Sequence, residues 1–88
     1  MKNLRRLKIL ERDARRQLRA LLYLKVRLEH RIEAERVVWA RRAYNKDPQA
    51  IINERTVRKL ELQRHEVLHS TEAARNALDL VRHELADA

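Results

Sequence analysis

The stretch YNKDPQ, residues 44–49, is the strongest break in a sequence that otherwise favours helix throughout. Asn45 is a residue type that tolerates the left-handed conformation in which many helices end, so we expect it to close a first helix. Asp47 is a strong N-cap, and Pro48 suits the first helical position because no backbone N–H is needed there. The stretch therefore predicts a helix end, a short turn and a second helix start.

The segments on the two sides of this turn have matched lengths of about 42 and 40 residues. Each would span roughly 60 Å as a helix, because an α-helix rises about 1.5 Å per residue. We expect helices over about 3–44 and 48–87, with the turn at 45–47. Two equal helices joined by a short turn are typical of an antiparallel hairpin, so the predicted fold is a single all-α domain of two coiled-coil-like helices.

The composition agrees with this fold class. Glycine and cysteine are absent, there is one proline, and 39% of the residues are charged. This profile is typical of long amphipathic helices, because β folds need turn glycines and β-branched runs. Without cysteine, neither a disulfide nor a thiolate metal site is possible. The longest apolar run is Ala20–Leu24, and the start MKNLRRLKIL does not resemble a signal peptide, so we expect a cytoplasmic protein without a membrane span.

Apolar residues recur along both segments at spacings that place them on one helical face. The second segment alternates steps of three and four residues, which is the coiled-coil pattern. In the first segment an 11-residue repeat links Leu10, Leu21, Ile32 and Ala43, which favours a nearly straight or slightly right-handed seam. The predicted seam residues are Leu7, Leu10, Ala14, Leu18, Leu21, Leu28, Ile32, Trp39, Val57, Leu60, Val67, Ala74, Leu78, Val81 and Leu85. Folding back about the turn pairs Leu7 with Leu85 and Ile32 with Leu60.

Two seam positions carry special side chains. Trp39 lies close to the turn and is interpreted as a core residue rather than a partner anchor. Arg64 would lie opposite Leu28, and a buried arginine needs a carboxylate, for which Glu29 and Glu61 are the candidates. A polar seam residue of this kind can fix the register or the oligomeric state. Further along, Ser70 begins a weak cap signal, but we favour a continuous second helix.

One seam does not use all of the apolar residues. In the first segment the remainder point away from the seam and form a candidate self-association surface: Leu22, Tyr23, Val26, Val37 and Val38. Leu62, Ile52 and Leu80 likewise do not all fit the second seam. Because two helices alone make a poor core, we expect a homodimer or higher oligomer, most simply a twofold dimer with a four-helix arrangement.

The charge is unevenly distributed along the chain. Residues 1–46 contain 15 basic and 5 acidic side chains, whereas residues 47–88 contain 6 basic and 8 acidic ones. A candidate basic strip lies opposite the first seam and consists of Arg5, Lys8, Arg12, Arg15, Arg16 and Arg19. Such a strip could follow a phosphate backbone or dock an acidic protein, and a solvated surface is the alternative. A GC-rich genome would raise the arginine content in the same way.

The stretch HEVLH, residues 65–69, matches the zinc-protease pattern H-E-x-x-H. In that pattern two histidines four residues apart bind zinc, and the glutamate polarises the metal-bound water. The sequence offers no third ligand within reach, and His65 and His69 project away from the seam. We interpret His65, Glu66 and His69 as a coincidence of helical composition, and we expect no metal or other cofactor.

These observations favour a non-enzymatic protein over an enzyme. The leading hypothesis is a self-associating helical hairpin that acts by binding another protein, as an adaptor, an inhibitor or a small accessory or phage-type factor. The alternative is a nucleic-acid-associated protein that binds the phosphate backbone through the basic strip.

Overall fold

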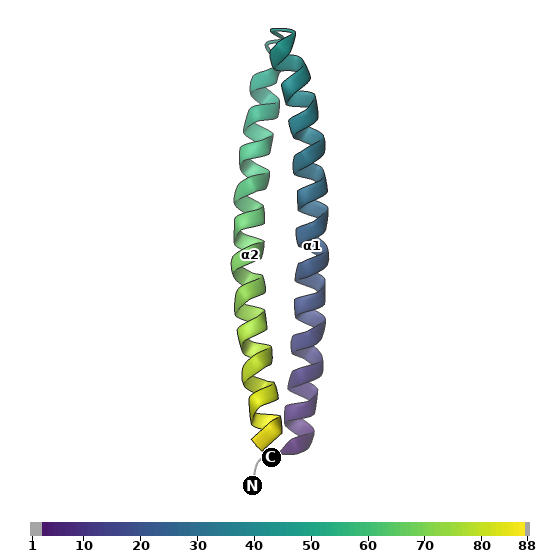
Figure 1. Cartoon of the computed structure of the whole chain (residues 1–88), viewed down its shortest axis with the longest axis vertical. Coiled ribbons are helices and arrows are strands. Elements are labelled where there is room, and N and C mark those ends of the chain that lie inside the picture. The colour runs from purple at the N-terminus through teal and green to yellow at the C-terminus, as the bar shows by residue number, and fades with distance from the viewer. Residues whose placement is uncertain (1–2, 88) are drawn as a thin grey trace.

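The chain folds as two long α-helices joined by one tight turn, in a computed structural model that describes residues 3–87. Helix α1 spans Leu4–Tyr44 and helix α2 spans Ala50–Asp87. The helices lie side by side and antiparallel, so the start of α1 and the end of α2 come together opposite the turn (Figure 1). The hairpin measures 68 Å along its long axis and 14 Å in the two other directions. The predicted all-α antiparallel hairpin is therefore confirmed.

The end of α1 is a Schellman motif. The N–H of Asp47 donates to the carbonyl of Arg42 at 2.8 Å, and the N–H of Lys46 donates to that of Ala43 at 3.1 Å. In this motif the residue after the C-cap adopts the left-handed conformation. That residue is Lys46, with φ of 54°, whereas Asn45 is the C-cap with φ of −82°. The expectation that Asn45 is left-handed was wrong, because the N–H of Asn45 still donates a helical hydrogen bond to the carbonyl of Arg41 at 3.1 Å, and the left-handed position falls on the next residue.

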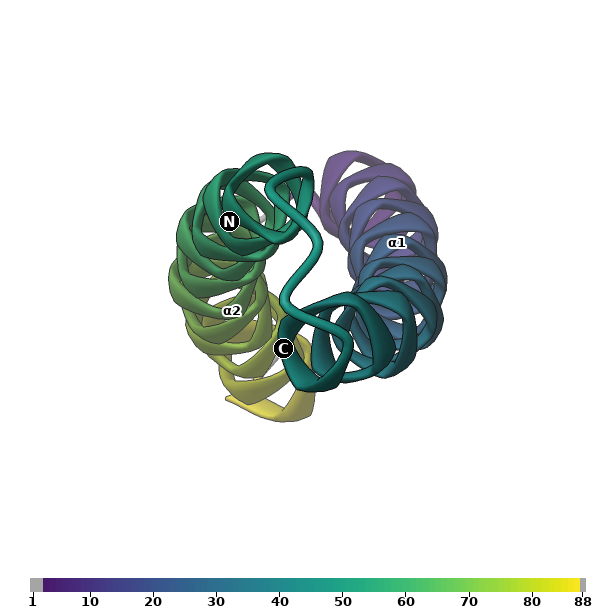
Figure 2. The ribbon, with the colours of Figure 1, turned by 90° about the horizontal axis from the view of Figure 1, so that it is seen from above.

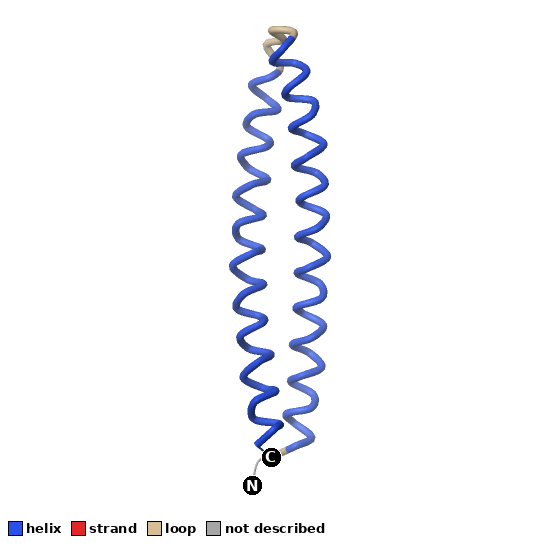
Figure 3. The backbone as a smooth tube through the Cα atoms, viewed as in Figure 1, coloured by secondary structure: helices blue, strands red, loops and turns tan. Residues whose placement is uncertain are grey.

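The start of α2 follows from the chemistry of Asp47. Its carboxylate oxygen Oδ1 accepts a hydrogen bond from the N–H of Gln49 at 2.9 Å, and its carbonyl accepts from the N–H of Ala50. These short-range bonds make a turn over residues 48–49 before regular helical bonding begins. As a result α2 begins at Ala50, two residues later than the sequence suggested, and the loop occupies residues 45–49 (Figure 3).

The inner faces of both helices show the same 3-4 alternation. In α2 the less exposed positions run from Ala50 to Leu85 in alternating steps of three and four, and in α1 they run likewise from Leu7 to Arg42. Seen end-on, the two helices wind around each other, as this spacing requires (Figure 2). The 11-residue repeat expected for α1 was therefore wrong as a description of the contact. Leu10 is 44% exposed and Ala43 is also exposed.

Polar residues explain why the apolar pattern of α1 is misleading. Glu11, Lys25, Glu35 and Arg42 occupy half-buried positions of the alternation. Long polar side chains can cover the seam with their aliphatic stems while their charged ends reach water. The positions of α1 that face α2 therefore follow a regular spacing, although the apolar residues of α1 alone do not.

The core is one thin layer between the helices. Of the predicted seam residues, the buried ones are Leu7, Leu28, Ile32, Val57, Leu60, Val67, Ala74 and Leu78, and the half-buried ones are Ala14, Leu18, Leu21, Trp39, Val81 and Leu85. The largest cluster lies near mid-length, where Leu28, Ile32, Leu60 and Val67 pack together. Ile32, at 2% exposure, is the centre of this cluster.

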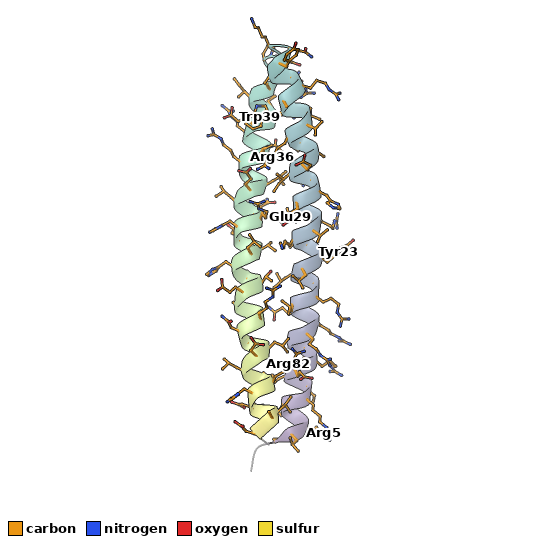
Figure 4. All side chains as sticks on the ribbon, viewed as in Figure 1. Arg5, Tyr23, Glu29, Arg36, Trp39 and Arg82 are labelled. Carbon is orange, nitrogen blue, oxygen red and sulfur yellow. The ribbon has the colours of Figure 1, made fainter. Side chains whose placement is uncertain are left out.

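Side-chain bonds across the seam fix the register. Glu11 pairs with Arg82 at 3.8 Å, and Arg36 pairs with Glu61. Figure 4 places Arg82 and Arg36 at the boundary between the helices. In each pair the sum of the two residue numbers is close to the sum for Ile32 and Leu60, which pack in one cluster. The two helices are thus antiparallel in one register along their length.

Arg64 lies in the seam without the expected carboxylate. Its Nε atom is buried and has no hydrogen-bond partner among the described residues. The two candidates pair elsewhere, because Glu29 lies 3.8 Å from Lys25 and Glu61 pairs with Arg36. The expectation of a Glu29 or Glu61 partner for Arg64 was wrong for this reason.

Helix α2 runs without interruption through Ser70. Thr71 is buried, and its hydroxyl donates to the carbonyl of Val67 at 2.7 Å. This bond uses the hydroxyl within the helix, so it does not cap a new one.

Candidate functional site

The basic strip lies on the outer side of α1. Arg5, Lys8, Arg12, Arg15, Arg16 and Arg19 are all exposed, and Figure 4 shows Arg5 at the start of the helix. Two of them have acidic neighbours, since Arg12 lies 3.7 Å from Asp13 and Arg15 lies 3.6 Å from Glu11. Within residues 3–87, the other four make no ion pair. Their charges are therefore free to meet an anionic partner.

The apolar residues expected to self-associate follow the basic strip along the same helix. Tyr23, Val26, Val37 and Val38 are exposed, and Leu22 is half-buried. Tyr23 is 67% exposed and points out from α1 (Figure 4). Arg27 lies over its ring at 5.9 Å from the centroid, within cation–π range. The basic strip and this α1 apolar patch (Tyr23, Val26, Val37 and Val38) thus lie end to end on one helix.

The outer face of α2 also exposes large apolar side chains. Leu62 and Leu80 are 67% and 68% exposed, and Ile51 and Ile52 are similarly open to solvent. Most residues around them on this face are charged or polar. Because single exposed apolar residues are common on proteins, these side chains bear on function only together with the other surface features of the hairpin.

The zinc-protease pattern lies entirely on the surface. His65, Glu66 and His69 are all exposed. Over residues 3–87, no group of three or more histidine, aspartate or glutamate side chains is placed to hold a metal ion. Two histidines on one helical turn can supply only two of the three or four protein ligands that zinc sites use. The interpretation of the motif as coincidental stays a prediction.

Sequence reasoning missed a polar cluster near the turn. Asn53 is buried, and its Oδ1 accepts a hydrogen bond from Arg42 at 2.8 Å while its Nδ2 donates to Glu35 at 3.1 Å. The signal was present in the spacing, because Asn53 lies four residues before Val57 and continues the α2 alternation. The cluster ties the two helices together beside the turn and supports the register rather than a binding site.

The hollows of the hairpin are shallow grooves along its surface. One is lined by Leu4, Arg5, Lys8, Ile9 and Arg12 of α1, together with Leu85 of α2. Another lies between Leu22 and Lys25 of α1 and the α2 segment from Leu68 to Asp79. Neither described helix has a stretch long and apolar enough to cross a membrane.

In comparisons with protein-family models, curated proteins and solved structures, no match to this chain was found.

Proposed function

We propose that the chain is a non-enzymatic, self-associating helical hairpin that acts through protein–protein contacts. The observation that carries this proposal is the row of apolar side chains exposed along the outer faces of both helices, including Tyr23, Val37, Leu62 and Leu80. A two-helix hairpin has only one thin core layer, so a further contact on these faces would add buried apolar surface that the chain alone lacks.

The shape of the molecule supports a binding role over a catalytic one. A hairpin 14 Å across is one pair of helices wide, and its described hollows are open grooves. Enzyme sites are usually concave and hold several polar groups in a water-excluding pocket. A long, narrow hairpin is better suited to present an extended face to another helix or chain.

The outer side of α1 indicates the chemistry of the partner protein. The basic strip and the α1 apolar patch lie on one face, so a partner segment that is acidic in one part and apolar in another would match both. Charge complementarity of this kind steers association and selects among partners, while the apolar contacts contribute most of the affinity. We therefore expect an acidic protein with an amphipathic helix.

The experiment is affinity capture from the native host with the full chain as bait. The control bait carries Tyr23→Ser and Val37→Ser, two exposed positions whose loss leaves the seam untouched. We expect a specific protein that is retained by the wild-type bait and released by the control, and recovery of the same protein by both would contradict the proposal.

A second candidate function, nucleic-acid association, is favoured by the four strip residues that lack ion pairs. Arg5, Lys8, Arg16 and Arg19 extend from one side of α1 over about 21 Å, from a rise of 1.5 Å per residue. Phosphate contacts by such residues make affinity fall steeply with salt, with a slope of about −0.9 per neutralised phosphate on a log–log plot. Fluorescence anisotropy with random duplex DNA tests this candidate. A slope near −4 that flattens in the Arg16→Ala and Arg19→Ala double variant supports it, and no binding at low salt removes it.

A further inference from the structure

The outer face of α2 carries a row of exposed residues with symmetric spacing. From Arg55 to Asp87, the exposed positions opposite the seam follow one another in alternating steps of four and three residues: Arg55, Lys59, Leu62, Glu66, His69, Ala73, Asn76, Leu80, His83 and Asp87. We name these ten positions the α2 outer stripe. All ten side chains are exposed, and the steps read the same in both directions. A twofold rotation between two antiparallel copies of α2 would therefore lay the stripe onto itself.

The side chains of the α2 outer stripe agree with this symmetry. With the twofold axis near Thr71, Leu62 of one copy faces Leu80 of the other, and each dimer contains that contact twice. These are the most exposed leucines of the hairpin. The positions nearest the axis are His69 and Ala73, and the small alanine would let the helices approach there. Isologous interfaces require this reciprocal pairing.

The charges at the two ends of the stripe are opposite. In the same antiparallel register Arg55 faces Asp87, and Lys59 faces His83. A parallel pairing would instead place each of these residues against itself in the second copy. Arg55 makes no ion pair within residues 3–87, and Asp87 pairs only with His83 of its own helix, at 3.6 Å. The stripe thus favours one orientation over the other.

The charge of each helix also favours α2 over α1 as the helix through which two copies of the chain meet. Leu4–Tyr44 holds 13 basic and 5 acidic side chains, while Ala50–Asp87 holds 6 basic and 7 acidic ones. Two copies of α1 in contact would bring two strongly basic helices together. Two copies of α2 carry almost no net charge and can meet without that repulsion.

We propose that two copies of this chain associate through the α2 outer stripe, antiparallel and about a twofold axis near Thr71. This contact depends on the self-association proposed above and places it on α2. The α1 outer face, with the basic strip and the α1 apolar patch, then stays open on both sides of the dimer for a different partner.

A charge-swap series measured by sedimentation equilibrium tests the contact. Arg55→Glu places two pairs of like charges in each dimer, as does Asp87→Arg, so each variant should raise the dimer dissociation constant about tenfold. The double variant restores both pairs with reversed sign and should return to within about threefold of wild type. Circular dichroism confirms that each variant stays helical. A double variant as weak as the singles would overturn the pairing.

Matched apolar variants separate this inference from the proposed function. Leu62→Lys should abolish the dimer, while Val37→Lys on α1 should leave it unchanged. The opposite result, with the dimer lost only in Val37→Lys, overturns the α2 contact but keeps self-association. A wild-type chain that stays monomeric up to about 1 mM, a range far above typical interface dissociation constants, overturns both.

Spin labels measure the orientation directly. The chain has no cysteine, so Ser70→Cys and Gln63→Cys each give a single labelling site beside the stripe. In the antiparallel dimer, the two labels are offset along the helix axis by about 3 Å at residue 70 and about 24 Å at residue 63. Electron–electron distances should therefore be clearly longer for Gln63→Cys. Equal distances at the two sites would indicate a parallel dimer and overturn the inference.

Discussion

Replacing Ile32 with alanine should destabilise the hairpin strongly, because this side chain is the centre of the core. Ile32 is 2% exposed and packs with Leu28, Leu60 and Val67. The substitution removes three carbon groups, each worth about 0.8 kcal/mol when buried, and leaves a cavity that costs more. The better helix propensity of alanine offsets about 0.4 kcal/mol. The expected loss in the free energy of unfolding is therefore about 2–3 kcal/mol.

The matched control is Ile52→Ala, which removes the same groups from a side chain that is 61% exposed on α2. Less than half of that apolar surface is buried, so we expect a loss of about 0.5 kcal/mol or less. Ile52 lies outside the α2 outer stripe, which keeps the comparison free of the proposed dimer contact.

Urea unfolding followed by circular dichroism at one fixed protein concentration measures both variants. The midpoint should fall clearly for Ile32→Ala, with little change in the slope of free energy against denaturant. Similar losses for the two variants, or a loss below about 1 kcal/mol for Ile32→Ala, would refute the placement of the seam.

Three further outcomes follow from single sites. Lys46→Gly should raise the melting temperature by about 3–6 °C, because glycine adopts the left-handed conformation at φ of 54° without the penalty that lysine incurs. An unchanged or lower melting temperature would contradict the Schellman ending of α1. Asn53→Ala should lower the free energy of unfolding by about 1–3 kcal/mol because Glu35 and Arg42 lose their hydrogen bonds to Asn53. The exposed control Gln17→Ala, outside the proposed contact surfaces, should have almost no effect in the same thermal melts. Metal analysis of untagged protein should find no stoichiometric zinc, and one zinc per chain abolished by His65→Ala would contradict the interpretation of the HEVLH stretch.

The turn and the lengths of its flanks were sufficient to predict the hairpin. A strong N-cap followed by proline leaves few alternatives, and the absence of glycine removes most other turns. The details of the turn were harder to predict, because the left-handed position depends on where α1 loses its last helical bond. That point is set by the bonds of Asp47 to Arg42 and Gln49, and local preference had pointed to Asn45 instead of Lys46.

The α1 seam shows a limit of reasoning from apolar spacing alone. The inner face follows a regular 3-4 alternation, but polar side chains such as Glu11 and Arg42 occupy part of it. Hydropathy places such residues in water, whereas their stems pack in the seam and their charged ends reach Arg82 or Asn53 across it. The apolar residues alone show an 11-residue repeat, and this repeat led to the wrong prediction that Leu10 lies in the seam.

The sequence predicted on which side of each helix the candidate surfaces lie, but not what they contact. A helical wheel places the basic strip and the α1 apolar patch away from the seam, and their side chains are exposed in the structure. The wheel could not choose which outer face meets a second copy, since that choice depends on both helices of the folded hairpin. The reciprocal positions of Leu62 and Leu80 and the near-neutral charge of α2 supply the reason to choose α2.

The mass of the wild-type chain in solution shows whether the hairpin self-associates. The chain has a mass of 10.6 kDa, so a dimer should give about 21 kDa in sedimentation equilibrium. We predict an average mass that rises toward the dimer value as the protein concentration increases from about 1 μM to about 1 mM. A fully helical protein that keeps the monomer mass over that whole range would contradict the proposed self-association.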